Sequence, residues 1–191
     1  MAALELTGGF LLGGLLVLAA FFFVVIFNGL IAMRNNVDKA WANIDVLLKK
    51  RLDLIPALVE VVQGYTTYER GVLEDITRIR VSALQAAGVP EKAQGNEAIS
   101  ASLKTIFLLA ENYPDLKASG NFLNLQEELS SIEGQIARRR EFYNDSVLLY
   151  NTRIKTIPGV FVADLIRCKP REYFKVGEEA EKPIEVAIGN R

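Results

Sequence analysis

The chain of 191 residues is long enough for one domain, or for one domain with a membrane anchor. It has 22 Lys and Arg residues against 23 Asp and Glu residues, which argues against a general nucleic-acid binder because such proteins need a basic excess. There is no histidine, and Cys168 is the single cysteine. This composition removes histidine-based acid–base catalysis, the common nucleophilic triads, most zinc sites and any internal disulfide.

Residues 6–33 form an apolar run without a charge, bounded by Glu5 and Arg34. About 20 helical residues are enough to cross a bilayer core of roughly 30 Å. A cleaved signal peptide would need a basic region ahead of its apolar run, and none is present. We therefore expect residues 1–34 to be an uncleaved, single-pass transmembrane anchor, with the lipid bilayer as its partner.

The cations that flank this run follow it rather than precede it, beginning with Arg34 and Lys39. The positive-inside rule then predicts that the C-terminal part lies in the cytoplasm. The expected location is the bacterial inner membrane. Within the run, Gly9 and Gly13 form a GxxxG pattern, which can let two membrane helices approach closely. Glycine is also simply common in membrane helices, so self-association into a homo-oligomer is an expectation with a plainer alternative.

After the apolar run, apolar residues recur at alternating steps of four and three, which is typical of a long helix in a bundle or coiled coil. This pattern predicts a helix over residues 35–87. Pro56 lies inside it and should kink the helix rather than break it, because the heptad phase continues beyond the proline. The two series are Val37, Ile44, Arg51, Leu58 and Tyr65, and Trp41, Leu48, Ile55 and Val62.

Two further helices are predicted, a shorter one over residues 96–111 and a long one over residues 121–156. A loop signal at residues 86–90 separates the first helix from the second. Pro158 and Gly159 end the last helix. The predicted fold is therefore all-α, an elongated antiparallel three- or four-helix bundle on one N-terminal transmembrane helix.

The bundle domain is expected to comprise residues 35–168, followed by an extended and mobile tail over residues 169–191. The short apolar segment at the end of the bundle could cap it or contact a partner or a second copy. Its candidate contact residues are Val160, Phe161, Leu165 and Ile166.

Two arginines, Arg51 and Arg139, fall on the apolar seams of the first and last long helices. A buried arginine must find anionic or carbonyl partners, because an unpaired buried charge is very costly. One interpretation is a polar site inside the bundle, and the favoured one is an ion-pair network that sets helix register. The carboxylates available as partners are Asp45, Asp53, Glu60, Glu128 and Glu133.

Four stretches of sequence carry a family resemblance. They are NNVDKAWANIDVLLKKRLDLIPALVEVVQGY at residues 35–65, YPDLKASGNF at 113–122, YNTRIKTIPG at 150–159 and KPREYF at 169–174. These stretches resemble the LemA family. The resemblance implies a membrane-anchored helical protein without an established enzymatic activity, and such proteins are often encoded beside membrane zinc proteases.

Together these observations favour a non-enzymatic, membrane-anchored scaffold or adaptor that recruits or organises another membrane protein, with a membrane zinc protease as the candidate partner. The alternative is a self-assembling structural protein that forms a membrane-associated homo-oligomer. No catalytic residue, metal site, cofactor, nucleic acid or small-molecule substrate is expected.

Overall fold

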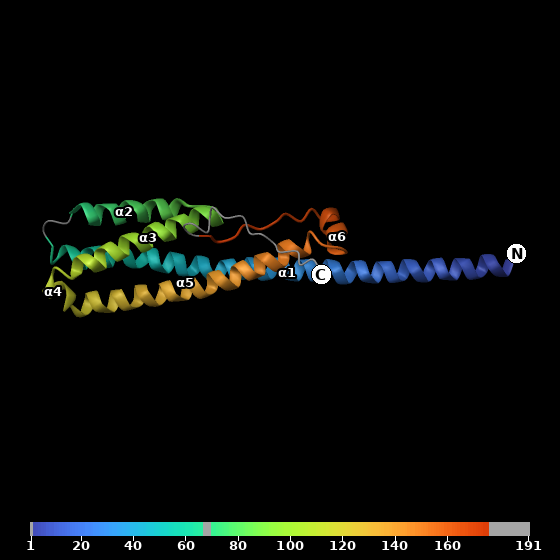
Figure 1. Cartoon of the computed structure of the whole chain (residues 1–191), viewed down its shortest axis with the longest axis horizontal. Coiled ribbons are helices and arrows are strands. Elements are labelled where there is room, and N and C mark those ends of the chain that lie inside the picture. Colours follow the sequence, from blue (N-terminus) through green and yellow to red (C-terminus); the bar gives the residue numbers. More distant parts are fainter. Residues whose placement is uncertain (1, 67–69, 176–191) are drawn as a thin grey trace, which may run out of the picture. The chain divides into compact units, whose positions relative to one another are not determined.

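The computed structural model describes residues 2–66 and 70–175, with side-chain surroundings described from residue 11 onward. Over these residues every regular element is a helix, so the predicted all-α class is confirmed (Figure 1). The helices are α1 (Ala2–Gln63), α2 (Arg70–Gln85), α3 (Val89–Ala110), α4 (Pro114–Lys117), α5 (Gly120–Arg153) and α6 (Gly159–Leu165).

The contacts divide the chain into two units. The first unit comprises residues 1–40 and 144–171, and the second comprises residues 41–143 and 172–191. Each unit draws on two stretches of the chain, and α1 and α5 each contribute to both. The division expected from the sequence, with boundaries at residues 34 and 168, stays a prediction.

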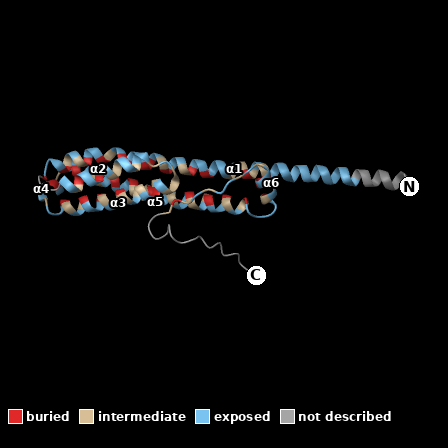
Figure 2. Ribbon diagram, turned by 90° about the horizontal axis from the view of Figure 1, so that it is seen from above, coloured by how far each residue is buried: buried red, intermediate tan, exposed pale blue. Residues whose placement is uncertain are grey.

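The second unit is a helical bundle in which α1, α2, α3 and α5 enclose an apolar core. Figure 2 marks buried residues in red along these helices. The chain returns along α1 in α2, where Arg80 Nε donates a hydrogen bond to the Leu52 carbonyl at 2.8 Å. The most deeply buried core residues are Ile55, Leu58, Val62, Ile76, Ile99, Ile106, Leu116, Phe122 and Leu129.

The heptad seam of α1 is buried as the spacing predicts. Ile44 and Leu58 are 0 % exposed, because residues seven apart return to the same side of the helix. Pro56 lies on the exposed side, and α1 continues through it to Gln63. The proline therefore does not split the helix, and the predicted kink stays a prediction.

The helix predicted over residues 35–87 ends earlier than expected, because α1 ends at Gln63. Gly64, Tyr65 and Thr66 form a turn, with the Tyr65 and Thr66 amides both bonded to the Val62 carbonyl. Tyr65, expected on the seam, is 45 % exposed. Glycine disfavours a helix interior by about 1 kcal/mol, so Gly64 was the sequence signal for this end.

The helix predicted over residues 96–111 corresponds to α3, which begins earlier, at Val89. Pro90 lies in its first turn, where a proline is tolerated because that amide has no partner within the helix. The polar stretch that follows is one side of the helix rather than a loop, since Ala93 in its midst is fully buried. The long helix α5 begins and ends within three residues of the predicted 121–156.

The first unit contains residues 2–40 of α1, the end of α5 and α6. Described side chains of residues 11–25 are all exposed, and Ile26 and Leu30 are the first buried residues of α1. Within the described residues, α1 is the one helix that is long and apolar enough to cross a membrane. In Figure 2 the ribbon of α1 is pale blue, the colour of exposed residues, next to its grey N-terminal end.

The approach of α6 to the end of α5 depends on a glycine. A Cβ added at Gly159 would lie 2.3 Å from the Arg153 carbonyl oxygen, which only the absence of a side chain avoids. At the other end of α6, Arg167 has a left-handed φ of 54°. The Cys168 amide bonds to the Ala163 carbonyl and the Arg167 amide to the Asp164 carbonyl, the two bonds of a Schellman cap.

The segment after α6, predicted as an extended tail from residue 169, contacts the helices over its described residues, and its mobility stays a prediction. In the first unit, the Asn151 side chain exchanges two hydrogen bonds of 2.8 Å with the Arg171 backbone, and Arg171 pairs with Asp38. In the second unit, Phe174 is fully buried. The rest of the predicted tail, residues 176–191, lies outside the described residues.

Candidate functional site

The polar site of the second unit is built around Arg51 of α1. Its position on the heptad seam directs a guanidinium into the core, where the side chain is 3 % exposed. The prediction that Arg51 is buried with a carboxylate partner is confirmed, and the partner is Glu133 of α5. Arg51 therefore joins two helices that are distant in sequence.

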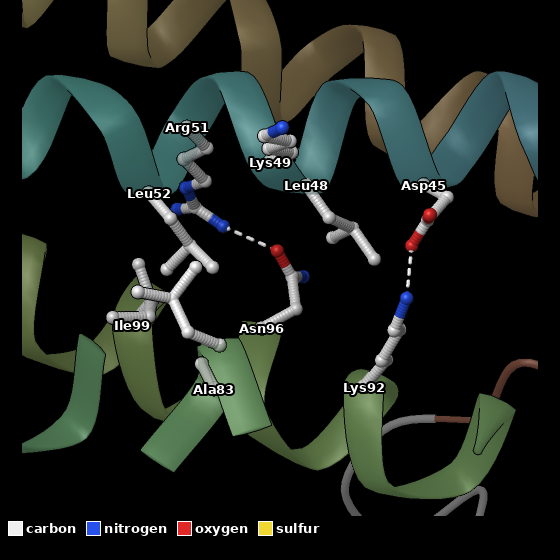
Figure 3. Close-up of a pocket in the computed structure, with 10 residues that line it drawn as sticks. Asp45, Leu48, Lys49, Arg51, Leu52, Ala83, Lys92, Asn96 and Ile99 are labelled. Atoms are coloured by element: carbon white, nitrogen blue, oxygen red, sulfur yellow. Dashed lines mark hydrogen bonds and ion pairs between the residues drawn. The ribbon is translucent and has the colours of Figure 1, made fainter. Parts of the chain in front are cut away.

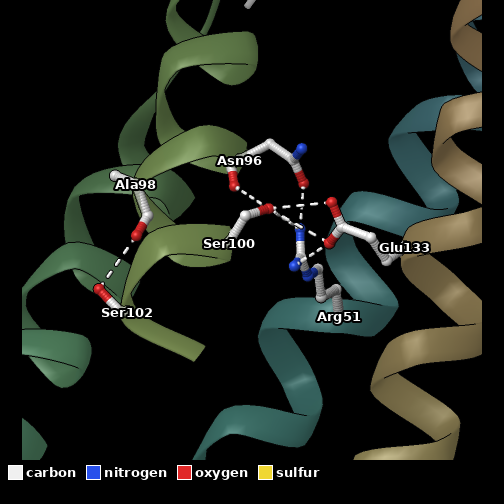
Figure 4. Close-up of polar contacts among 6 residues, drawn as sticks. All are labelled: Arg51, Asn96, Ala98, Ser100, Ser102 and Glu133. Carbon is white, nitrogen blue, oxygen red and sulfur yellow. Dashed lines mark hydrogen bonds and ion pairs between the residues drawn. The ribbon is translucent and has the colours of Figure 1, made fainter. Parts of the chain in front are cut away.

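A third helix completes the network (Figure 4). Arg51 Nη1 donates to Asn96 Oδ1 at 2.7 Å and to Ser100 Oγ at 3.0 Å, both on α3. The Ser100 hydroxyl lies 3.1 and 3.2 Å from the two Glu133 carboxylate oxygens. Asn96 and Ser100 are four residues apart, so they project from the same side of α3 toward the arginine.

The electrostatics of this network are set by burial. Desolvation lowers the pKa of Arg51 from its ordinary value, and the negative charge of Glu133 opposes that shift. An arginine nevertheless keeps its charge in proteins. Among the described residues, Arg51 Nε is buried without a hydrogen-bond partner, so the guanidinium relies on its two terminal nitrogens. Removing a partner would therefore leave a buried cation poorly compensated.

A pocket of about 260 Å³ lies beside the arginine, between α1, α2 and α3 (Figure 3). Its floor is mostly apolar, and its polar rim includes the ion pair between Lys92 and Asp45. The Lys92 ammonium also lies 5.7 Å from the centre of the Trp41 ring, within range of a cation–π contact. The lining residues are Asp45, Leu48, Lys49, Arg51, Leu52, Ala83, Leu84, Lys92, Asn96 and Ile99.

The chemistry of the network is that of a helix-to-helix clamp. The Ser100 hydroxyl has a single hydrogen to donate, and its candidate acceptors are the Glu133 carboxylate and the Asn96 carbonyl. Glu133 is already paired with the guanidinium, so each of the three groups has a partner within the network. Within residues 2–66 and 70–175, no three carboxylate or thiol groups come together in a way that could hold a metal ion.

The prediction that Arg139 lies on the buried seam of the last long helix is wrong, because Arg139 is exposed. Residues Ile136 and Tyr143 around it are buried, but α5 turns by 100° per residue, and a step of three from Ile136 falls at the edge of the buried stripe. Asp53 is also exposed and has no place in the network. Of the five carboxylates named as partners, Glu133 pairs with Arg51, while Asp45 and Glu128 pair with Lys92 and Lys50.

Sequence reasoning missed the two α3 residues of the network, because their region was taken for a loop and a helix start. The available signal was the pattern of Asn96 and Ser100 beside the buried positions Ile99 and Leu103. Polar residues four apart at the margin of an apolar stripe indicate a shared contact across the bundle.

The four residues predicted to contact a partner lie in or next to α6, and they differ in exposure. Phe161 and Leu165 are 68 % and 69 % exposed, whereas Val160 and Ile166 are partly buried. Gly13 of the GxxxG pattern has no atom within 4 Å of the position a Cβ would take. The backbone of Gly9 belongs to α1, and its surroundings lie outside the described residues.

Comparison with known proteins adds to this geometry. The chain is 21 % identical over 184 residues to magnetosome protein MamQ 2 of Paramagnetospirillum magneticum, covering 83 % of this chain and 68 % of the relative. Magnetosome protein MamQ of Magnetospirillum gryphiswaldense matches to the same extent. Protein LemA of Metamycoplasma hominis is 29 % identical over 154 residues, which cover 77 % of this chain and 68 % of the relative.

The family described as the LemA family matches residues 40–188 of this chain. That range includes all of α2, α3, α4, α5 and α6, and the part of α1 that carries Arg51. It contains the whole Arg51 network and its neighbouring pocket. The resemblance seen in the four sequence stretches is thus confirmed, and the chain belongs to the LemA family.

Proposed function

We propose that this protein is a non-enzymatic, membrane-anchored scaffold or adaptor that holds another membrane protein at the bilayer. The observation that carries the proposal is the continuity of α1. This single helix includes the apolar run at residues 6–33 and the heptad seam that forms one wall of the bundle. A helix that serves both roles ties the bundle to the anchor without a linker, which suits a protein whose task is to position a partner.

The Arg51 network supports a structural role for the bundle. It joins α1, α3 and α5 through a charge-assisted contact that fixes helix register, as buried polar residues do in coiled coils. A scaffold needs a defined surface more than a reactive centre.

The bundle also presents apolar side chains on its surface. Phe142 of α5 is 63 % exposed, and Val46 of α1 is 67 % exposed. Large exposed apolar side chains are candidates for contacts between proteins, where aromatic residues are enriched. The resemblance to LemA proteins makes a membrane zinc protease the first partner to test.

The test is an affinity purification of the full chain in mild detergent, with the tag placed after Arg191 and the partners identified by mass spectrometry. A membrane protein recovered near stoichiometry, and reduced by Phe142→Ser, supports the adaptor. Leu84→Ser is the matched control, since Leu84 is 48 % exposed on another helix. Recovery of the bait alone, from cells grown under several conditions, would contradict an adaptor.

A self-assembling structural protein is the second candidate, favoured by the open surroundings of Gly13 and Gly14 in α1. In this role a second copy's helix would pack on the small residues. Gly13→Leu should then reduce the particle mass measured by light scattering in detergent. An unchanged mass would remove Gly13 from the interface.

The proposed location is the inner membrane with the bundle in the cytoplasm. Cys168 is the only thiol and is partly exposed. A membrane-impermeant maleimide should therefore leave it unlabelled on intact spheroplasts and label it after lysis. Labelling without lysis would place the bundle on the outer side.

A further inference from the structure

Three apolar side chains at the base of the first unit are left in contact with solvent. Ile157 is 76 % exposed, Phe161 is 68 % exposed and Leu165 is 69 % exposed. They are spaced by four residues, and Phe161 and Leu165 project from one side of α6. Another side of α6 is buried, at Val162 and Ala163. The short helix is thus apolar on an exposed side as well as on its buried side.

The position of α6 in its own unit shows what can cover this side. Both views place α6 beside α1 (Figures 1 and 2). Burial raises the pKa of Tyr150, near the end of α5, and the positive charge of Arg34 of α1 is among those that oppose the rise. The chain then continues past Ile154 into α6. Both views show the N-terminal part of α1 extending beyond α6 with no other helix beside it (Figures 1 and 2). Ile26 and Leu30 are the first buried residues of α1 after its exposed stretch.

The length of that free surface matches a bilayer. The exposed residues 11–25 and the apolar residues 6–10 ahead of them make twenty helical residues. At about 1.5 Å per residue they extend roughly 30 Å, the thickness of the hydrocarbon core. A bilayer centred on this stretch has one boundary where the exposed stretch ends, at Ile26.

The charges around α6 have the sign that a phospholipid surface attracts. Lys155, Arg167 and Lys169 are exposed, and Arg153 is partly exposed. Asp164 is the one acidic residue between residues 153 and 169. Cations beside exposed apolar residues are the pattern of helices that lie in the interface, with the apolar side among the acyl chains and the cations at the phosphates.

We propose that α6 is an interfacial foot that inserts Ile157, Phe161 and Leu165 into the lipid surface around α1. The foot fixes the first unit to the membrane at a second point beside the apolar part of α1. The occupant of this apolar surface is the phospholipid itself. The inference rests on α1 crossing the bilayer, and it is independent of any protein partner.

The experiment places a fluorescent reporter on the foot of the full chain in vesicles of phosphatidylcholine and phosphatidylglycerol. Phe161→Cys is made in a Cys168→Ser background and labelled with an environment-sensitive dye. Phosphatidylcholine with a nitroxide high on its acyl chain serves as the quencher. We expect quenching at position 161 to be several-fold stronger than at position 142 in the matched Phe142→Cys control, where the parent side chain is 63 % exposed.

A third reporter separates failure of the foot from failure of the anchor. Leu16→Cys lies in the exposed apolar stretch and should be quenched by a nitroxide deep in the acyl chain. Strong quenching at 16 together with weak quenching at 161 would overturn the foot while leaving the anchor intact. A dye at 161 that is shielded from aqueous iodide but not quenched by lipid would also overturn it, because a second copy or another protein would then cover α6.

Discussion

Leu58 and Leu16 belong to the same helix, yet the first is fully buried and the second is 63 % exposed. Leu58 lies in the second unit, where four helices turn their apolar sides inward around a shared core. Leu16 lies in the first unit, where residues 11–25 leave every described side chain outward. The comparison shows that apolar residues of one helix can serve two purposes. Those at the level of Leu58 are removed from water by burial in the protein core, whereas those at the level of Leu16 belong to a stretch that is long and apolar enough to cross a membrane.

The units also differ in how they are held together. The second unit combines an apolar core with the buried Arg51 network. The first unit has fewer buried residues and depends on close backbone fits, at Gly159 and at the Arg167 cap, and on the hydrogen bonds of Asn151. Substitutions should therefore act through cavities and charges in the second unit, and through backbone geometry in the first.

The largest effect is expected from Leu58→Ala, because it leaves a cavity in the core. Such changes cost about 2–5 kcal/mol of unfolding free energy. The matched change Leu16→Ala should leave the bundle's unfolding free energy within about 0.5 kcal/mol, since a side chain that is 63 % exposed has few contacts to lose. Urea unfolding of the full chain in mild detergent, followed by circular dichroism, measures both. Equal losses would contradict the contrast between the units.

Glu133→Ala should cost about 1–3 kcal/mol, because it leaves the Arg51 guanidinium without its anion. Glu128→Ala provides a matched control on the same helix. Its carboxylate is similarly exposed and pairs with Lys50 at 2.8 Å, but that partner is 54 % exposed, so the loss should stay below about 1 kcal/mol.

The same unfolding assay compares the two glutamates. If both variants lose the same free energy, the burial of Arg51 has no energetic consequence. Combining Glu133→Ala with Arg51→Met should recover part of the loss, since an apolar side chain of similar length needs no partner.

Gly159→Ala should loosen α6 at a cost of about 1–3 kcal/mol, because the new Cβ would overlap the Arg153 carbonyl. Hydrogen exchange of the α6 amides is the readout, and it should rise while exchange in α3 stays the same. Gly134→Ala is the control within α5, where the nearest atom is an Arg138 nitrogen at 3.6 Å. That change should stabilise the helix by about 1 kcal/mol. Unchanged exchange in α6 would show that the junction tolerates a side chain.

The smallest effect is expected from Arg167→Gly, which should stabilise the α6 cap by about 0.5–1 kcal/mol. A left-handed φ strains every residue with a Cβ, and glycine relieves it. Slower hydrogen exchange of the Cys168 amide, which closes the cap, is the sensitive measurement. Arg167→Ala keeps the Cβ and should give no gain, so equal gains from both would point to the lost charge instead.

Several features could be predicted from local sequence. The seam of α1 was predicted because a heptad repeat depends only on helix geometry, and Arg51 was placed in the core for the same reason. The start of α2 was not predicted. The partner of Arg51 was not predicted either, because the sequence offered five carboxylates and only the packing of the helices brings Glu133 to the arginine. The prediction for Arg139 was wrong, because the buried stripe of α5 had to be located to within one residue.

The sequence by itself determined the helical class, the apolar segment and the family, because periodicity and composition act within one helix or along one continuous stretch. The tertiary structure decided which polar groups meet at Arg51, how the segment after α6 packs, and which side of α6 stays exposed. These depend on contacts between residues dozens of positions apart. No local pattern specifies such contacts, since they form only when the helices pack.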